Sequence, residues 1–191
     1  MLSDIPSLSL KNQVELSTHS LIFPVEIISI YSSSRKAIRV KANFASTYLF
    51  FLKHHVLCQY EVLTDITAIP IPETTDYEVA YELLSLRFNN RLSIKVNPQN
   101  FTITSVSNIY YSATWGECEL WDMYGIFAEN HERLSRLLTD YGFEGYPLRK
   151  DFPLSGYYDV KYNEFQKRII ADTLELSQEY RMFDYKVSYT Y

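Results

Sequence analysis

Glycine is absent from the first 115 residues of this 191-residue chain, because all five glycines lie at or beyond Gly116. That stretch therefore has nothing from which to build a glycine-rich loop that cradles phosphate. Charge divides at the same place: acidic and basic residues are equal in number up to Trp115, and the whole net charge of −5 belongs to the remainder. Without a basic excess, nucleic-acid binding is disfavoured.

Alternating hydrophobic residues predict a β-hairpin over residues 25–31 and 37–42. Asn43 is then predicted to cap a helix with an aromatic stripe that faces the core. Further strands are predicted over 60–69, 77–88 and 92–96, with Asn89 and Asn90 in the tight turn between the last two. The order β-β-α-β-β-β predicts an α+β fold, with an antiparallel or mixed sheet packed with helices on one face. The stripe consists of Phe44, Tyr48, Phe51, Leu52 and His55.

The pattern turns helical from about residue 104, where Trp115, Cys118, Trp121 and Tyr124 recur every three residues. A second short helix is predicted over 131–138, where three leucines share one side. Gly142 lies where the glycine that ends such a helix belongs.

Residues 141–191 contain thirteen aromatic residues and fifteen charges but few aliphatic ones. Such a segment has little from which to build a core, yet it is too aromatic for a free linker. We expect it to lie extended on another surface. The predicted organisation is an N-terminal extension (1–24), an α+β domain (25–140) and an extended, partner-binding C-terminal tail (141–191).

One dense group of carboxylates and histidine stands out in the sequence. On a helix Glu119 and Asp122 share a face, whereas Glu117 and Glu119 point about 200° apart and do not converge on one ion. A charged helix face, exposed or in an interface, is therefore favoured over a metal or acid–base site. His54–His55 is likewise read as a satisfied or exposed pair. The group comprises Glu117, Glu119, Asp122 and His131.

The two cysteines, Cys58 and Cys118, are sixty positions apart, which excludes the close spacing of zinc and iron–sulphur motifs. We expect both thiols to be reduced and buried. No run of about 18 apolar residues predicts a membrane span, and residues 1–20 lack a secretory or Arg-rich transit pattern. Near the tail, aromatic residues interleave with the charges of Arg149, Lys150 and Asp151, which favours an interface over a solvated loop.

Three blocks of the sequence resemble a known family, the thirty-kilodalton subunit of respiratory complex I, called NADH dehydrogenase subunit 9 when mitochondrially encoded. They are ECELWDMYG at 117–125, LSRLLTDYGFEG at 134–145 and PLRKDFPLSGY at 147–157. The similarity extends upstream through LTDI at 63–66 and YELLSLRF at 81–88, and covers roughly residues 25–185. Cys118, Ser135 and Tyr146 depart from the family pattern.

This resemblance implies a non-catalytic structural subunit in the hydrophilic arm of NADH:ubiquinone oxidoreductase, peripheral to the mitochondrial inner membrane on its matrix side. It implies support of the forty-nine-kilodalton type subunit by the tail, contact with other hydrophilic-arm subunits, and FMN and iron–sulphur clusters carried by neighbours rather than by this chain. The residues expected at the partner interface are Glu119, Asp122, His131, Arg136, Asp140, Tyr141, Phe143, Arg149, Lys150, Asp151, Phe152 and Tyr157.

Two other hypotheses come from different classes of protein. A small metal-dependent enzyme would use Glu117, Glu119, Asp122 and His131. A soluble adaptor for some other assembly would share the aromatic tail but would not migrate with a large respiratory complex.

Overall fold

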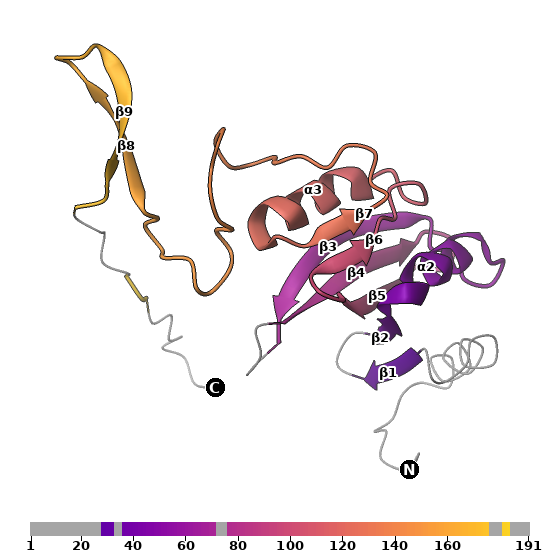
Figure 1. Ribbon diagram of the computed structural model, residues 1–191. Coiled ribbons are helices and arrows are strands. Elements are labelled where there is room, and N and C mark those ends of the chain that lie inside the picture. The colour runs from indigo at the N-terminus through magenta and orange to yellow at the C-terminus, as the bar shows by residue number, and fades with distance from the viewer. Residues whose placement is uncertain (1–27, 33–35, 72–75, 176–180, 184–191) are drawn as a thin grey trace. The chain divides into compact units, whose positions relative to one another are not determined.

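The computed structural model describes residues 28–32, 36–71, 76–175 and 181–183 (Figure 1). The predicted extension, residues 1–24, lies outside them. The chain divides into two compact units, Met1–Phe143 and Glu144–Tyr191. In the first unit the elements are β1 (Ile28–Ser32), β2 (Lys36–Lys41), the 3₁₀ turn η1 (Ala42–Phe44), α2 (Ala45–His54), β3 (Val62–Pro70), β4 (Tyr77–Ser85), β5 (Asn90–Asn97), β6 (Thr102–Thr104), α3 (Ala113–Tyr124) and β7 (Phe127–Glu129).

Five strands form one mixed sheet in the order β1-β2-β5-β4-β3. β1 and β2 make the predicted antiparallel hairpin, while β2 pairs in parallel with β5. The antiparallel β4–β5 pairing places Tyr81 opposite Ile94 and Val79 opposite Val96, so large apolar side chains line one face. The predicted α+β fold with a mixed sheet is confirmed.

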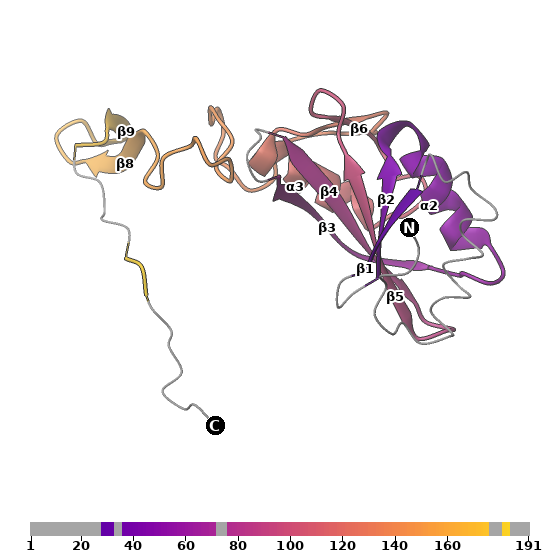
Figure 2. The same ribbon diagram turned by 90° about the horizontal axis from the view of Figure 1, so that it is seen from below.

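Both helices contribute to one buried core on that face. α3 packs against β3, and α2 lies beside β2 and β5 (Figure 1, Figure 2). Tyr48 and Leu52 of α2 are fully buried, in line with the predicted stripe, and Phe51 packs partly buried against them. Phe44, also in the stripe, is 44% exposed because it precedes the regular helix.

The structure differs from the prediction at two element boundaries, the start of α2 and the turn between β4 and β5. Asn43 does not cap a helix, since it lies within η1, and the N-cap position of α2 is Phe44, which makes no side-chain cap. The α-helix starts only after this tighter turn has redirected the chain. In the β4–β5 turn, Asn89 does adopt a positive φ of 47°, but Asn90 already belongs to β5.

The helix predicted from the residues that recur every three positions between 115 and 124 is confirmed as α3. It ends at Gly125, whose φ of 70° lets its N–H bond to Trp121 O while Ile126 N–H bonds to Leu120 O. Gly142 has the same φ of 70° but follows no helix, because no helix forms over 131–138. Neither cysteine is in a disulfide, and both are buried, as predicted.

The second unit contains an antiparallel hairpin of β8 (Tyr158–Asn163) and β9 (Arg168–Thr173). Its turn is organised by the Asn163 side chain, which accepts the backbone N–H groups of Phe165 and Gln166. Neither helix in the described parts of the chain combines the length and apolarity needed to cross a bilayer.

Candidate partner interface

Helix α3 contains two carboxylates, Glu117 and Asp122, whose exposed fraction is 0%. Burying a carboxylate is costly unless hydrogen bonds or opposite charges replace the water it loses. Each of these side chains is satisfied by a different segment of the first unit, Glu117 by the loop before α3 and Asp122 by the segment that follows β7.

Asp122 accepts five hydrogen bonds from a segment that follows β7. Its Oδ2 accepts the backbone N–H groups of Leu137 (3.1 Å), Leu138 (2.7 Å) and Thr139 (3.0 Å). Its Oδ1 accepts the Thr139 hydroxyl at 2.6 Å and the Arg136 guanidinium at 3.1 Å. Burial opposes ionisation, but these bonds outweigh it and lower the pKa of Asp122 to about 2.

The same bonds explain why the predicted helix over 131–138 is wrong. In a helix the N–H groups of residues 137 and 138 would bond to carbonyls four residues earlier. Here they point instead at the Asp122 carboxylate, together with the N–H of Thr139. The three leucines have the spacing of one side of a helix, but they lie on irregular backbone that is hydrogen-bonded to α3.

Glu117 is the acceptor for a different stretch of backbone, the loop between β6 and α3. Its Oε1 accepts the Val106 N–H at 2.7 Å, and its Oε2 accepts the Ser105 hydroxyl at 2.6 Å. Here burial is the larger effect, so the pKa of the Glu117 carboxyl is raised although these bonds and His131 act in the opposite direction.

His131, at the start of the segment that follows β7, contacts α3. Its Nε2 lies 3.8 Å from Glu117 Oε2 and 3.3 Å from the Thr114 carbonyl oxygen, while its Nδ1 accepts the Arg133 N–H at 3.1 Å. This geometry assigns the ring proton to Nε2. The thiol of Cys118 adds a weak contact at 3.7 Å to the Arg133 carbonyl. Residues 131–139, which we call the strap, are thus attached to α3 along their length.

The strap is held by its backbone and leaves several side chains exposed, among them Leu138 at 60%, and the residues that follow it are mostly exposed as well. Tyr141 is fully exposed and Asp140 is exposed, whereas Phe143 is half-buried with the Arg136 guanidinium 5.9 Å from its ring centre. Glu119 is exposed on α3. The bonds to Asp122 therefore hold the backbone just before Asp140 and Tyr141, whose side chains are exposed.

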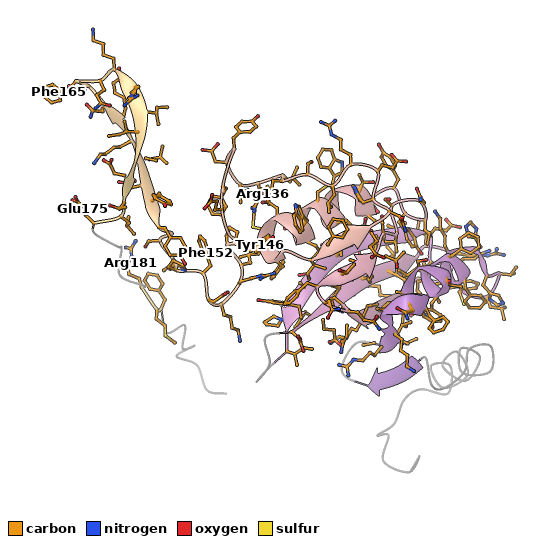
Figure 3. All side chains as sticks on the ribbon, viewed as in Figure 1. Arg136, Tyr146, Phe152, Phe165, Glu175 and Arg181 are labelled. Atoms are coloured by element: carbon orange, nitrogen blue, oxygen red, sulfur yellow. The ribbon has the colours of Figure 1, made fainter. Side chains whose placement is uncertain are left out.

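The second unit opens with a small cluster of rings around Arg149. The Arg149 guanidinium lies 4.4 Å from the centre of the Tyr146 ring, and Phe152 meets Tyr157 edge-on at 5.4 Å. Gly145 has a φ of +106°, and a Cβ there would come within 2.9 Å of the Phe152 ring. Figure 3 labels Tyr146 and Phe152 near the start of this unit.

The twelve residues predicted for the interface fall into three groups. The side chains of Asp122 and His131 are buried and hydrogen-bonded within the chain. Their role as partner contacts stays a prediction. Arg136, Phe143, Arg149 and Phe152 are half-buried, and Glu119, Asp140, Tyr141, Lys150, Asp151 and Tyr157 are exposed.

The prediction of a charged face on α3, exposed or in an interface, is wrong for Glu117 and Asp122, because both are buried within the chain. A signal was present in the spacing, since Glu117 follows Ala113 by four and precedes Leu120 by three, both of which are buried. Among the residues that the structure describes, no group of three or more His, Cys, Asp or Glu side chains is arranged to hold a metal ion.

The chain matches the model of a family described as respiratory-chain NADH dehydrogenase, 30 Kd subunit, over residues 38–158. It is 42% identical to NADH-ubiquinone oxidoreductase subunit 9 of Reclinomonas americana over 159 residues, which cover 82% of this chain and 78% of that protein. The protein of the same name from Prototheca wickerhamii is 46% identical over 149 residues, 77% of this chain and 78% of that one.

A potato (Solanum tuberosum) relative, named NADH dehydrogenase (ubiquinone) iron-sulfur protein 3, is 46% identical over 144 residues, 72% of this chain and 76% of its own length. Two solved structures share the fold. A chain of the archaeal membrane-bound sulfane sulfur reductase has a TM-score of 0.65 and 22% identity, covering 75% of this chain and 86% of that one. The trypsin-resistant fragment of Nqo5 has a TM-score of 0.51 and 20% identity, covering 65% and 98%.

Proposed function

The chain belongs to the thirty-kilodalton subunit family of respiratory-chain NADH dehydrogenase, and we propose that it is a non-catalytic structural subunit of complex I that supports the forty-nine-kilodalton type subunit through its C-terminal tail. In this proposal it lies in the hydrophilic arm, peripheral to the mitochondrial inner membrane on the matrix side, and contacts other subunits of that arm. It contributes to electron transfer from NADH to ubiquinone by keeping its neighbours in position.

One observation carries the proposal. Among the described residues of the second unit, 144–175 and 181–183, none is buried, although many are aromatic or aliphatic. A unit without a buried core gains too little from burial to offset the entropy of ordering its backbone. Its ordered conformation therefore depends on apolar surface supplied by another protein, which is the role proposed for the forty-nine-kilodalton type subunit.

The redox groups are assigned to neighbouring subunits. The potato relative has iron–sulfur protein in its name, but an iron–sulphur cluster takes four cysteine or histidine ligands. This chain has two cysteines in all, both buried in the first unit, and in the part of the chain that the structure describes no three His, Cys, Asp or Glu side chains gather to hold a metal. Its donors do not fit a cluster, so we place the FMN and the clusters in the neighbours.

The proposal is tested by the size of the particle that contains the chain. We expect it to migrate on a native gel with a very large complex that oxidises NADH, and to be released from membranes when that complex is dissociated. The isolated chain should not oxidise NADH. Oxidation by the pure chain with one flavin bound per molecule, or migration only as a small species, would contradict the proposal.

Arg149→Ala tests the tail specifically. Removing a guanidinium that is buried against a partner leaves the partner's group unpaired, at a cost of about 2 to 5 kcal/mol of binding free energy. The variant should therefore fold normally and fail to assemble. Arg91→Ala, the same change at an exposed position of β5, is the control and should assemble fully. Normal assembly of the Arg149→Ala variant would show that this arginine makes no essential contact with a partner.

A further inference from the structure

The register of the β8–β9 hairpin divides its side chains between two unlike faces. Residues paired across antiparallel strands lie on the same face, and successive residues alternate between faces. Tyr158 is opposite Thr173, Val160 opposite Ala171, and Tyr162 opposite Ile169. We call these six residues the aromatic face. The other face contains mainly polar and charged residues: Asp159, Lys161, Asn163, Arg168, Ile170 and Asp172.

The aromatic face is open to solvent within this chain. Val160 is 61% exposed, Tyr162 is 62% exposed and Ile169 is 71% exposed. Phe165, in the turn, is 100% exposed and lies at the tip of the hairpin (Figure 3). A two-stranded hairpin with one unburied apolar face is at best marginally stable in water. The face therefore needs an apolar surface to cover it.

The size of the face argues against a second copy of this chain as the cover. Its large side chains present on the order of 500 Å² of apolar surface. A stable interface takes roughly 800 Å² from each partner. The aromatic face is thus too small to form a complex alone and is suited to be one part of a longer contact along the tail.

The charged face argues against a lipid surface. It carries two acidic and two basic side chains, and Lys161 is paired with Asp172 at 2.8 Å. Hairpins or helices that bind anionic membranes carry an excess of Lys and Arg opposite their apolar face. Here the opposite charges are balanced, which suits solvent rather than a headgroup layer.

We propose that the aromatic face of the β8–β9 hairpin docks on an apolar patch of a neighbouring protein subunit of the complex, with the charged face turned to solvent. The inference rests on the proposed function and adds to it which side of the tail makes the contact. Phe165 extends the same contact beyond the strands, at the tip of the hairpin.

Thiol labelling at neighbouring positions tests the assignment of faces. The native cysteines are buried in the first unit, so a new cysteine in the hairpin reports local access. In the intact complex, a Val160→Cys variant should react about tenfold or more slowly than in the isolated chain, because labelling requires an accessible thiolate. The Asp159→Cys variant, one residue earlier on the charged face, should react at similar rates in both. Ala171→Cys repeats the test opposite Val160 with a smaller change.

Four outcomes would overturn the inference: equal labelling of the two faces in the complex, protection of Asp159→Cys instead, protection lost when the membrane is dissolved in detergent, and protection that appears in the isolated chain as its concentration rises. If the Val160→Cys variant assembles into the complex and its thiol still reacts freely, this inference is wrong and the proposed function stands. If the chain never migrates with a large complex, both the inference and the proposed function are wrong.

Discussion

Replacing Asp122 by Asn removes the negative charge that fastens the strap to α3 while leaving the volume of the side chain almost unchanged. The carboxylate has two acceptor oxygens for five donors. An amide has one acceptor oxygen and a donating NH₂ group. If the oxygen stays with the three backbone N–H groups, the NH₂ faces the Thr139 hydroxyl, which can reverse its role, and the Arg136 guanidinium, which cannot.

The expected loss of stability follows from the pKa of Asp122. A shift from 3.8 to about 2 corresponds to about 2 kcal/mol that the ionised form contributes to folding at neutral pH. The Arg136 side chain is 28% exposed, so its ion pair with Asp122 adds little beyond this. We therefore expect Asp122→Asn to lower the free energy of unfolding by about 2 to 3 kcal/mol.

Urea unfolding of the full chain, followed by the fluorescence of Trp115 and Trp121 on the same helix, measures that loss. Hydrogen exchange gives the local reading: the amides of residues 137–139 should lose most of their protection, while the amides of β4 and β5 keep theirs relative to global stability. Glu119→Gln, the same chemistry at an exposed position of α3, is the control and should change stability by less than about 0.5 kcal/mol.

The pH dependence has a definite sign. The folded pKa of Asp122 lies below its unfolded value, so its contribution is complete above about pH 5 and is lost as the pH falls from about 4 towards 2. The difference between the native chain and the Asp122→Asn variant should therefore shrink over that range. A difference that stays constant down to pH 2, or amides of 137–139 that remain protected in the variant, would refute the fastening role of this carboxylate.

Two further substitutions test the packing and charge of α3. Glu117→Gln should lower the free energy of unfolding by less than about 1 kcal/mol at pH 7. Because the folded pKa of Glu117 is raised, the native chain loses stability as the pH rises above 4.5, and the variant should improve relative to it. A loss as large as that of Asp122→Asn would contradict this. Gly116→Ala would place a Cβ 3.1 Å from Ile66 Cδ1, so despite the better helix propensity of alanine we expect a net loss of about 1 kcal/mol in urea unfolding, partly recovered by adding Ile66→Val.

The elements with strong local periodicity could be predicted from the sequence. The β1–β2 hairpin and the core stripe of α2 follow from apolar spacing, and the core uses that stripe at Tyr48 and Leu52. The three-residue repeat correctly places α3, although of its four residues only Cys118 is buried. Asn43 shows the limit of local signals: its residue type suits a cap, but the chain enters α2 through a 3₁₀ turn that places Phe44 at the N-cap position. Capping preference is worth about 1 kcal/mol, which tertiary packing readily overrides.

The strap could not be predicted because its conformation depends on partners about fifteen residues away. Residues 134–138 have the spacing of a helix side, yet the N–H groups of Leu137 and Leu138 are bonded to the Asp122 carboxylate. In the same way, the donors that allow Asp122 to be buried lie in the strap, so the local sequence of α3 does not reveal them. The predicted interface residues Asp140 and Tyr141 are exposed directly after the strap, and their contact with a partner stays a prediction.

Glu117 and Asp122 show how the number of donors decides the character of a buried carboxylate. Both lie in α3 with an exposed fraction of 0%, so burial alone would raise the pKa of each. Glu117 receives one backbone N–H and one hydroxyl, and its pKa is raised. Asp122 receives three backbone N–H groups, a hydroxyl and a guanidinium, and its pKa falls to about 2. Because all five hydrogen bonds to Asp122 come from the strap, loss of its charge should loosen the strap before it loosens the sheet.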